Sequence, residues 1–178
     1  MAKEDNAIVL DFLAYGYPLE KKRMPIAQAV GTAGFTLLEL APRRDAKLEV
    51  GEKVYIGDGS REKIQFIAGR LHREKLTETA KAQLEEFIVE FVKENEKKFV
   101  DFYNNAQAMN TRLHQLELLP GFGKKHAHAI LEARKDKPFE SFEDIRERVH
   151  NLPDPERAIE KRIIEELSEM QRHNLFTA

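Results

Sequence analysis

Glycine, lysine and histidine residues crowd the start of one predicted helix, in the stretch LLPGFGKKHAHAILEAR at residues 118–134. Gly121 and Gly123 permit backbone angles that a side chain would penalise, and they leave backbone N–H groups uncovered. Free N–H groups at a helix N-terminus, together with the helix dipole, attract anions such as phosphate. Lys124 and Lys125 would oppose the dipole of an isolated helix, so their position makes better sense when an anion binds. The spacing therefore predicts a phosphate-binding turn, with an ordinary tight turn as the alternative.

Two histidines in the same stretch, His126 and His128, raise the alternative of a metal site. Residues two apart on a helix point about 200° away from each other, whereas chelation from one helix needs a spacing of about four residues. The chain has no cysteine, which excludes thiolate metal sites, disulfides and cysteine nucleophiles. The GxSxG, GxxxxGK[ST] and HExxH patterns are also missing from the sequence. We therefore predict no metal, no cofactor and no catalytic residue, and hence a protein that is not an enzyme.

The stretch has a weaker copy later in the chain, at an offset of 33 residues. LPGFGKKHAHAILEA, which begins at Leu119, overlays LPDPERAIEKRIIEE, which begins at Leu152. At this offset Asp154 and Glu156 replace the two glycines, and their carboxylates would repel a phosphate. Asp154 is a favourable helix N-cap, particularly because a proline follows it. We expect the second turn to be structural and the first to carry the binding.

The elements that position these turns change character along the chain. Residues 7 to about 72 read as short strands separated by glycine-marked turns, which is typical of a small β-barrel. Thr77 is a predicted N-cap, and the helical spacing of apolar residues follows it at Leu84, Phe87, Ile88, Phe91 and Val92. We predict one long helix, or two with a kink, that packs this stripe on a neighbour. Short helices follow from residue 111, with capping residues at Ser141 and Asp154.

Composition sets broad limits on the class of protein. The chain has 178 residues, 42% of them hydrophobic, with a net charge of −2, and it has no apolar run long enough to span a membrane. Its N-terminus is charged where a secretory signal would be apolar. We expect a cytoplasmic protein with no membrane partner. Because the total charge is nearly neutral, any contact with a nucleic acid must depend on local basic clusters.

The glycine turn resembles the helix-hairpin-helix motif, whose pattern LPGhGxKxAxxI is matched from Leu119 to Ile130, and the likeness continues over about sixty residues. In that family the hairpin amides contact a nucleic-acid backbone without reading its sequence, in some members with a monovalent cation on the hairpin carbonyls. A purely structural or protein-contacting hairpin is the alternative. The candidate contacts in this chain are Gly121, Phe122, Gly123, Lys124, Lys125, Arg134 and Lys135.

The whole chain resembles an uncharacterised archaeal family of predicted RNA-binding proteins, notably through QAVGTAGFTLLEL, VYIGDG and LHQLELLPGFGKK. The resemblance implies an α+β, multidomain protein. Its expected parts are a small OB-like β-barrel (1–76), a helical connector (77–110) and an all-α tandem helix-hairpin-helix domain (111–178). In OB-type barrels exposed aromatic residues stack on bases and basic loops hold the backbone. The candidates for these roles are Tyr15, Tyr17, Lys21, Lys22 and Arg23.

Two functions remain open at this point. The first is non-enzymatic binding of nucleic acid, with RNA favoured over DNA by the family resemblance and not by any residue. The second is a protein-interaction scaffold within a nucleic-acid-processing or translation-related complex, which the nearly neutral charge would suit.

Overall fold

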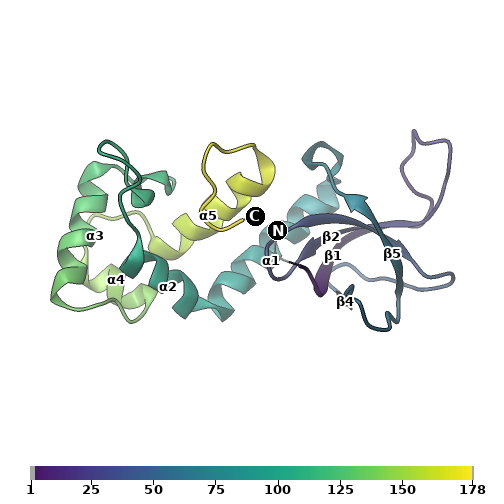
Figure 1. Cartoon of the computed structure of the whole chain (residues 1–178), viewed down its shortest axis with the longest axis horizontal. Helices are drawn as coiled ribbons and strands as arrows, with labels where there is room; N and C mark the ends of the chain where they lie inside the picture. Colours follow the sequence, from purple (N-terminus) through teal and green to yellow (C-terminus); the bar gives the residue numbers. More distant parts are fainter. Residues whose placement is uncertain (1–2, 178) are drawn as a thin grey trace. The chain divides into compact units, whose positions relative to one another are not determined.

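The computed structural model describes residues 3–177 and contains both sheet and helix (Figure 1). The chain forms two compact units, one of residues 1–87 with 166–178 and one of residues 88–165. The first unit therefore contains the predicted strands and the second most of the predicted helices, while helix α1 (Glu78–Glu94) begins in the first unit and ends in the second. The α+β class predicted from the sequence is confirmed.

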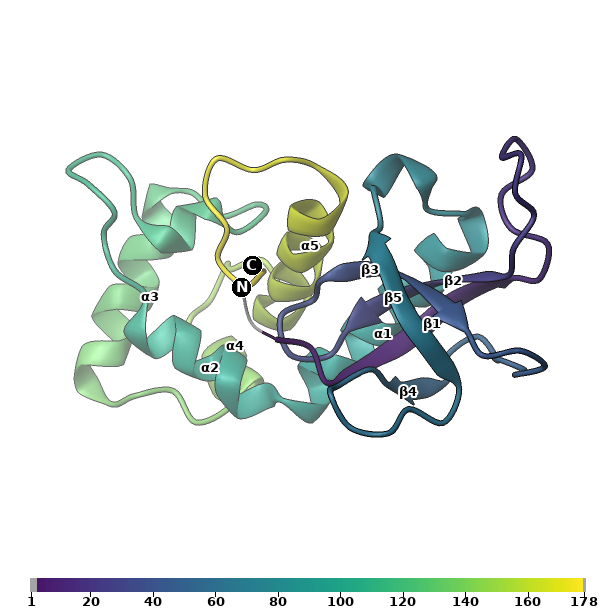
Figure 2. The ribbon, with the colours of Figure 1, turned by 45° about the vertical axis from the view of Figure 1, so that its right-hand side comes forward.

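The first unit is built on a five-stranded antiparallel sheet in the order β4-β1-β2-β3-β5. The strands are β1 (Asn6–Leu13), β2 (Ile26–Gly31), β3 (Leu37–Pro42), β4 (Lys53–Tyr55) and β5 (Ile64–Arg70). The sheet curls so that β5 crosses in front of β1 and β2 (Figure 2). In the described residues no ladder joins β4 to β5, so the predicted barrel is an open half-barrel. The physical reason is that β4 has only three residues, all paired with β1.

A bulge in β1 changes which side chains reach the core of this sheet. Val9 belongs to the buried cluster of the sheet, whereas Leu10 is fully buried outside that cluster. The ladder shifts between Val9, which pairs with Ala29, and Asp11, which pairs with Gln28. Leu10 is thus the extra residue of the bulge, and a bulge re-aims the side chains around it. The buried cluster within the sheet comprises Ala7, Val9, Ala27, Ala29, Leu38, Leu40, Leu48, Val54, Ile56 and Ile64.

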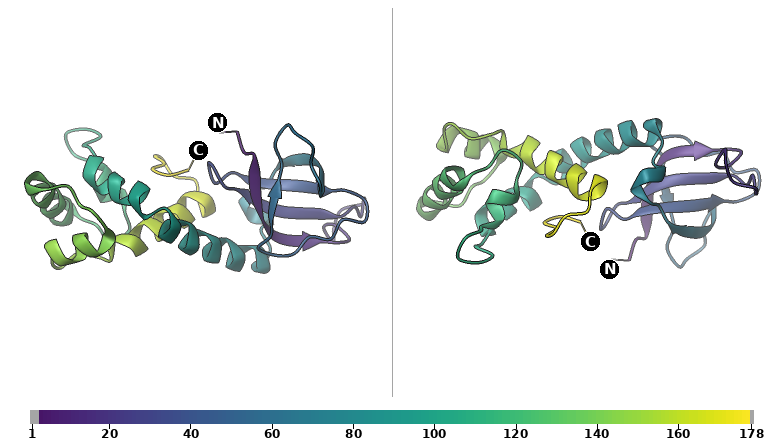
Figure 3. Two further views of the ribbon diagram at one scale, coloured as in Figure 1. Left: turned by 90° about the horizontal axis from the view of Figure 1, so that it is seen from below. Right: turned by 90° about the horizontal axis from the view of Figure 1, so that it is seen from above.

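Two helices follow the short 3-10 helix η1 (Arg73–Lys75): α1, and α2 (Glu96–Asn105). The Thr77 hydroxyl accepts the Ala80 N–H at 3.0 Å, which confirms the predicted N-cap. The start of α1 lies beside the sheet (Figure 3). Within the first unit, Phe87 of α1 forms an edge-to-face pair with Phe35, with 6.2 Å between ring centroids. The helix breaks at Asn95, whose side-chain amide donates to the carbonyl of Phe91 at 2.8 Å. Of the two predicted forms, the sequence therefore adopts two helices.

The second unit packs helices around two turns. After the 3-10 helix η2 (Gln115–Leu118) come α3 (Lys124–Asp136), α4 (Phe142–Arg148) and α5 (Pro155–Ser168). The Ser141 hydroxyl accepts the Asp144 N–H at 2.9 Å and so caps α4, as predicted. The Tyr103 hydroxyl donates to the carbonyl of Pro155 at 2.7 Å, and burial raises its pKa well above the ordinary value. The core of this unit includes Phe99, Tyr103, Leu116, Leu119, Phe122, Ile130, Ile145, Ile159 and Ile163.

Candidate nucleic-acid interface

The first turn, residues 119–123 between η2 and α3, requires a glycine at one position. Gly121 has a φ of +81°, a left-handed conformation that residues with side chains rarely adopt. A Cβ at this position would also lie 3.4 Å from the Cγ of Pro153. The Phe122 N–H donates to the carbonyl of Leu119 at 3.0 Å and closes the turn. Gly121 therefore directs the chain into α3.

The first backbone amides of α3 have no acceptor among the residues that the structure describes. Gly123 is the N-cap residue, and its N–H donates to Nδ1 of His126 at 2.9 Å. The amides of Lys124 and Lys125, at the first two positions of α3, have no acceptor within the part of the chain that the structure describes. His126 thus acts as a capping residue, a role that its spacing from Gly123 did not reveal in the sequence. An anion at this turn would meet the Lys124 and Lys125 amides, while the Gly123 amide is already satisfied.

The two lysines of the turn differ in their contacts. The Lys124 Nζ donates to the carbonyl of Arg112 at 2.6 Å and pairs with Oε1 of Glu117 at 3.2 Å. The Glu117 carboxylate also accepts the His114 N–H at 2.8 Å, and this bond and the ion pair lower its pKa. The Lys125 side chain is exposed and forms no ion pair or hydrogen bond with the described residues. Lys125 is therefore the lysine whose charge is available to an anion.

Three other predicted contacts do not face an anion at the turn. The Phe122 ring is buried, with centroids 6.2 Å from Tyr103 and 5.7 Å from His126, so it belongs to the core. Arg134 donates to the carbonyl of Tyr103 at 3.0 Å, and Lys135 pairs with Glu132 at 2.8 Å. Both residues lie near the C-terminus of α3, about 16 Å along its axis from Lys124. The fold therefore brings residues 121–125 together and separates Arg134 and Lys135 from them.

The second turn, residues 149–154 between α4 and α5, matches the first at a different offset from the one that the sequence suggests. The left-handed residue here is Asn151, with a φ of +59°, which stands 30 positions after Gly121. The N-cap is Asp154, which stands 31 positions after Gly123. The offset of 33 aligned two Leu-Pro pairs and is wrong as a structural register. Asparagine tolerates the left-handed conformation better than most residues. The residue type at position 151 could therefore have indicated the left-handed position of this turn in the sequence.

The start of α5 offers an anion no free amide at its first three positions. Asp154 Oδ1 accepts the N–H groups of Glu156 at 3.0 Å and Arg157 at 3.2 Å, so the predicted N-cap is confirmed. Burial raises the pKa of Asp154, but the hydrogen bond from Arg146 and the backbone donors outweigh it and lower that pKa overall. Arg146 Nη2 also pairs with Glu156 at 2.9 Å. Pro155 has no N–H, so each N–H group at the first three positions of α5 has an acceptor. The carboxylates of Asp154 and Glu156 place negative charge at the start of this helix.

We expect the Asp154→Ala variant to be less stable by about 1 kcal/mol, the usual loss for a helix N-cap. Its affinity for nucleic acid should equal that of the parent, because the first three positions of α5 present no free donor to a phosphate. Urea unfolding and oligonucleotide titration measure the two quantities. Asp154→Asn, which retains a capping oxygen without the charge, is the matched control and should lose less. A drop in affinity at unchanged stability would contradict the structural role.

The candidate barrel contacts lie in the loop between β1 and β2, residues 14–25. Tyr15 is 81% exposed, and Lys21, Lys22 and Arg23 are exposed as well. Tyr17 is half-buried: its hydroxyl accepts Nε2 of Gln28 at 3.1 Å, and Nζ of Lys75 lies 4.8 Å from its ring centroid. Burial raises the pKa of Tyr17. Tyr17 therefore anchors the loop, whereas Tyr15 is free to stack on a base.

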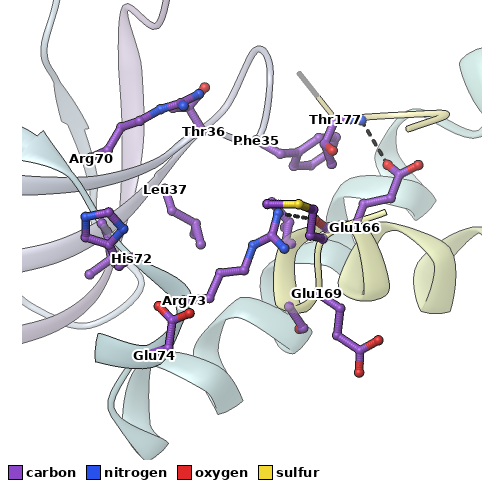
Figure 4. A pocket seen from close by; sticks show the side chains of 14 residues that line it. Phe35, Thr36, Leu37, Arg70, His72, Arg73, Glu74, Glu166, Glu169 and Thr177 are labelled. Carbon is purple, nitrogen blue, oxygen red and sulfur yellow. Dashed lines mark hydrogen bonds between the residues drawn. The ribbon is translucent and has the colours of Figure 1, made fainter. Parts of the chain in front are cut away.

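The first unit also contains a cavity of about 560 Å³ that no sequence pattern indicated (Figure 4). Its lining includes Arg70 at the end of β5, His72 and Arg73 from the segment after it, and Glu166, Glu169 and Thr177 from the C-terminal part of the chain. Arg73 donates to the carbonyl of Glu166 at 2.8 Å, while the buried Glu166 carboxylate accepts the N–H groups of Phe176 at 3.1 Å and Thr177 at 3.0 Å. These contacts hold the C-terminal segment in place.

No three histidine, aspartate or glutamate side chains among residues 3–177 gather in a way that could hold a metal ion. None of the helices in this part of the chain combines the length and the apolar character that crossing a bilayer requires.

Comparison with known proteins places the chain in an uncharacterised group. It is 44% identical over 173 residues to the uncharacterized protein MJ0038 of Methanocaldococcus jannaschii, covering 97% of this chain and 78% of the relative. It is similar to the crystal structure of Af1531 from Archaeoglobus fulgidus, with a TM-score of 0.87 and 48% identity, covering 98% of this chain and all of the other. Residues 3–178 match the family model described as "Protein of unknown function (DUF655)". The chain therefore belongs to the DUF655 family, whose members named here are archaeal.

Proposed function

We propose that this protein is a non-enzymatic nucleic-acid-binding protein that holds one backbone phosphate at residues 121–125. The observation that carries the proposal is the pair of amides at Lys124 and Lys125, which have no acceptor in the described structure and stand beside the unpaired Lys125 side chain. Two N–H groups, the helix dipole and one ammonium group suit a phosphate oxygen. Such contacts position the protein on the backbone and do not read bases.

The arrangement of the two turns supports a tandem helix-hairpin-helix domain. Each turn has one left-handed residue followed by an N-cap, and Gly121 lies against Pro153 of the other turn. The Arg162 Nη1 donates to the carbonyl of Leu118 at 3.1 Å and joins α5 to the residues before the first turn. On this interpretation the second hairpin supports the first and leaves binding to it.

The strand order β4-β1-β2-β3-β5 supports an OB-type barrel that is left open between β4 and β5. OB-type barrels commonly bind oligonucleotides. RNA is favoured over DNA by the resemblance to predicted RNA-binding proteins, and no residue of the hairpin discriminates between the two.

The test compares the salt dependence of binding for the parent, Lys125→Ala and Lys124→Ala/Lys125→Ala. The slope of log affinity against log salt should fall by roughly 0.7 to 0.9 for each phosphate that the variant no longer neutralises. Most of this change should already occur in Lys125→Ala, because Lys124 is engaged by Glu117 and the carbonyl of Arg112. Lys161→Ala, an exposed lysine on α5, is the matched control. The reduction in affinity should be similar for all base sequences.

The pairing of Lys124 with Glu117 favours the second candidate, a protein-interaction scaffold, because it reduces the charge that the turn presents. If the double-lysine variant binds single- and double-stranded RNA and DNA as the parent does, with the same salt slope, the phosphate proposal is wrong and the scaffold replaces it.

A further inference from the structure

One end of the open sheet gathers basic residues from three loops that are far apart in sequence. The ladders pair Leu13 with Ile26 at this end, and Pro42 with Ile64. The loop of residues 14–25, the loop of residues 43–52 and the end of the loop of residues 56–63 therefore meet where β1 and β3 finish and β2 and β5 begin. The first two loops project from the same end of the sheet in both ribbon views (Figures 1 and 2). We call the basic residues there the cationic rim: Lys21, Lys22, Arg23, Arg43, Arg44 and Arg61.

Hydrogen bonds hold two arginines of the rim in place. The Arg43 N–H donates to the carbonyl of Lys63, and its Nε donates to the carbonyl of Arg61, both at 2.8 Å. The Nε of Arg61 in turn donates to the carbonyl of Gly57 at 2.8 Å. These acceptors are neutral carbonyls, so both guanidinium groups keep their full charge. Arg43 and Arg61 are thus positioned by hydrogen bonds that do not cancel their charge.

Acidic residues in the same loops neutralise only part of this charge. Lys63 pairs with Glu52, and Glu20 pairs with Lys75 at 3.3 Å. Asp58 pairs with Lys3, and Arg61 of the rim also helps to lower its pKa. Asp45, Glu49 and Glu62 are exposed and remain beside the rim. The six cations of the rim outnumber these four acids, so this end of the sheet carries a net positive charge although the chain as a whole is at −2.

Exposed aromatic side chains accompany the rim. Gly16, with a φ of +72°, lets the loop of residues 14–25 close tightly, since a Cβ there would come within 2.7 Å of the carbonyl oxygen of Met24. The closed loop presents Tyr15 at 81% exposure. On the edge strand β5, Phe66 is 48% exposed and pairs with Ala41, near the Pro42–Ile64 pair that ends the ladder. One aromatic ring thus stands in the first loop and another on β5.

We propose that the cationic rim, with Tyr15 and Phe66, is a second binding surface that takes single-stranded nucleic acid. Basic side chains that follow a backbone, combined with aromatic rings on which bases stack, are the features that bind single strands without strong sequence preference. A duplex keeps its bases stacked inside and cannot offer them to these rings. The surface lies in the first unit and uses none of residues 121–125, so it stands or fails independently of the hairpin proposal.

The test uses the full chain and a fluorescently labelled single strand of mixed sequence, as RNA and as DNA, and a duplex of the same sequence. The charge variant is Lys22→Ser/Arg44→Ser, which removes one cation from each of two loops. Its matched control is Lys97→Ser/Lys161→Ser, two exposed lysines on α2 and α5. The stacking variants are Tyr15→Ala and Phe66→Ala, both at exposed positions that leave the core intact.

We expect the charge variant to reduce the salt slope for the single strand by about 1.4, or about 0.7 for each phosphate that it no longer neutralises, and the control to leave the slope unchanged. Each stacking variant should bind the single strand about tenfold more weakly, with a smaller effect on the duplex.

Three results would overturn the proposal: parental single-strand binding in the rim variants, an equal reduction in the control, or an equal reduction for the duplex. Binding of the parent to vesicles of phosphatidylserine and phosphatidylcholine, without binding to any oligonucleotide, would also overturn it, because the exposed Leu19 would then mark a membrane contact. A hairpin variant that weakens binding while the rim variants do not would leave the proposed function standing and remove only the rim.

Discussion

Replacing Arg148 with Met is expected to lower the free energy of unfolding by about 3 kcal/mol, because several charge-assisted hydrogen bonds disappear together. The Arg148 Nη2 donates to the carbonyls of Ala133 and Lys137, each at 2.6 Å. Its Nη1 reaches Asp144 at 3.2 Å, and the guanidinium lies 4.6 Å from the ring centroid of Phe139. Arg148 therefore joins the C-terminus of α3 to α4 and to the segment between them.

Urea unfolding measures this change in stability, and two variants define its origin. Arg148→Lys retains the charge but has no planar fork to bridge several acceptors, so it should recover only part of the stability. Arg157→Met removes an exposed arginine whose nearest carboxylate lies 3.9 Å away, and should change stability by less than about 0.5 kcal/mol. An Arg148→Met variant as stable as Arg157→Met would show that the observed hydrogen bonds do not stabilise the unit.

The same substitution should change the response to acid. The Glu140 N–H, and then Arg148, lower the pKa of Asp144 below its ordinary value. A carboxyl group with a lowered folded-state pKa stabilises the fold above its unfolded-state pKa, and this contribution is lost as the pH falls through the folded-state value. Arg148→Met should therefore lose less stability than the parent between neutral and acid pH. Urea midpoints at a series of pH values measure the difference, and parallel curves would contradict it.

Replacing Gly121 with Val is expected to cost about 2 kcal/mol of stability, since a β-branched residue at a left-handed position is strained. The new side chain would also press on Pro153 and cover the approach to the Lys124 amide. We expect affinity for nucleic acid to fall by at least as much as in Lys124→Ala/Lys125→Ala, since an anion would no longer reach the amides that the lysine variants leave intact.

Gly123→Ala is the matched control for Gly121→Val. Gly123 has a φ of −107°, and a Cβ there would lie 3.9 Å from His126 Nδ1, an ordinary contact. The alanine variant should lose less than about 1 kcal/mol of stability. Affinities are compared at a temperature where circular dichroism shows each variant folded. If folded Gly121→Val binds as tightly as the parent, the turn does not contact phosphate.

Several features of this protein could be predicted from the sequence because they depend on neighbours in the chain. The caps at Thr77, Ser141 and Asp154 are of this kind, since each side-chain oxygen reaches an N–H group within three residues. The glycine turn before α3 belongs with them, because its backbone angles are set by the residue itself. The buried stripe of α1 also follows from helical periodicity, as Leu84, Ile88 and Val92 show.

The partners of the charged side chains were decided by the tertiary structure, because they depend on where distant segments meet. Arg134 was a candidate phosphate contact, yet it donates to a carbonyl 31 residues earlier in the chain. No sequence pattern indicated that Arg43 and Arg61 would be in contact. The antiparallel ladder of β3 and β5 brings them together. The open sheet has the same cause, since the shortness of β4 limits how many residues can pair. Local chemistry thus determined where the helices begin and the chain turns, whereas long-range pairing decided which charges stay free to bind.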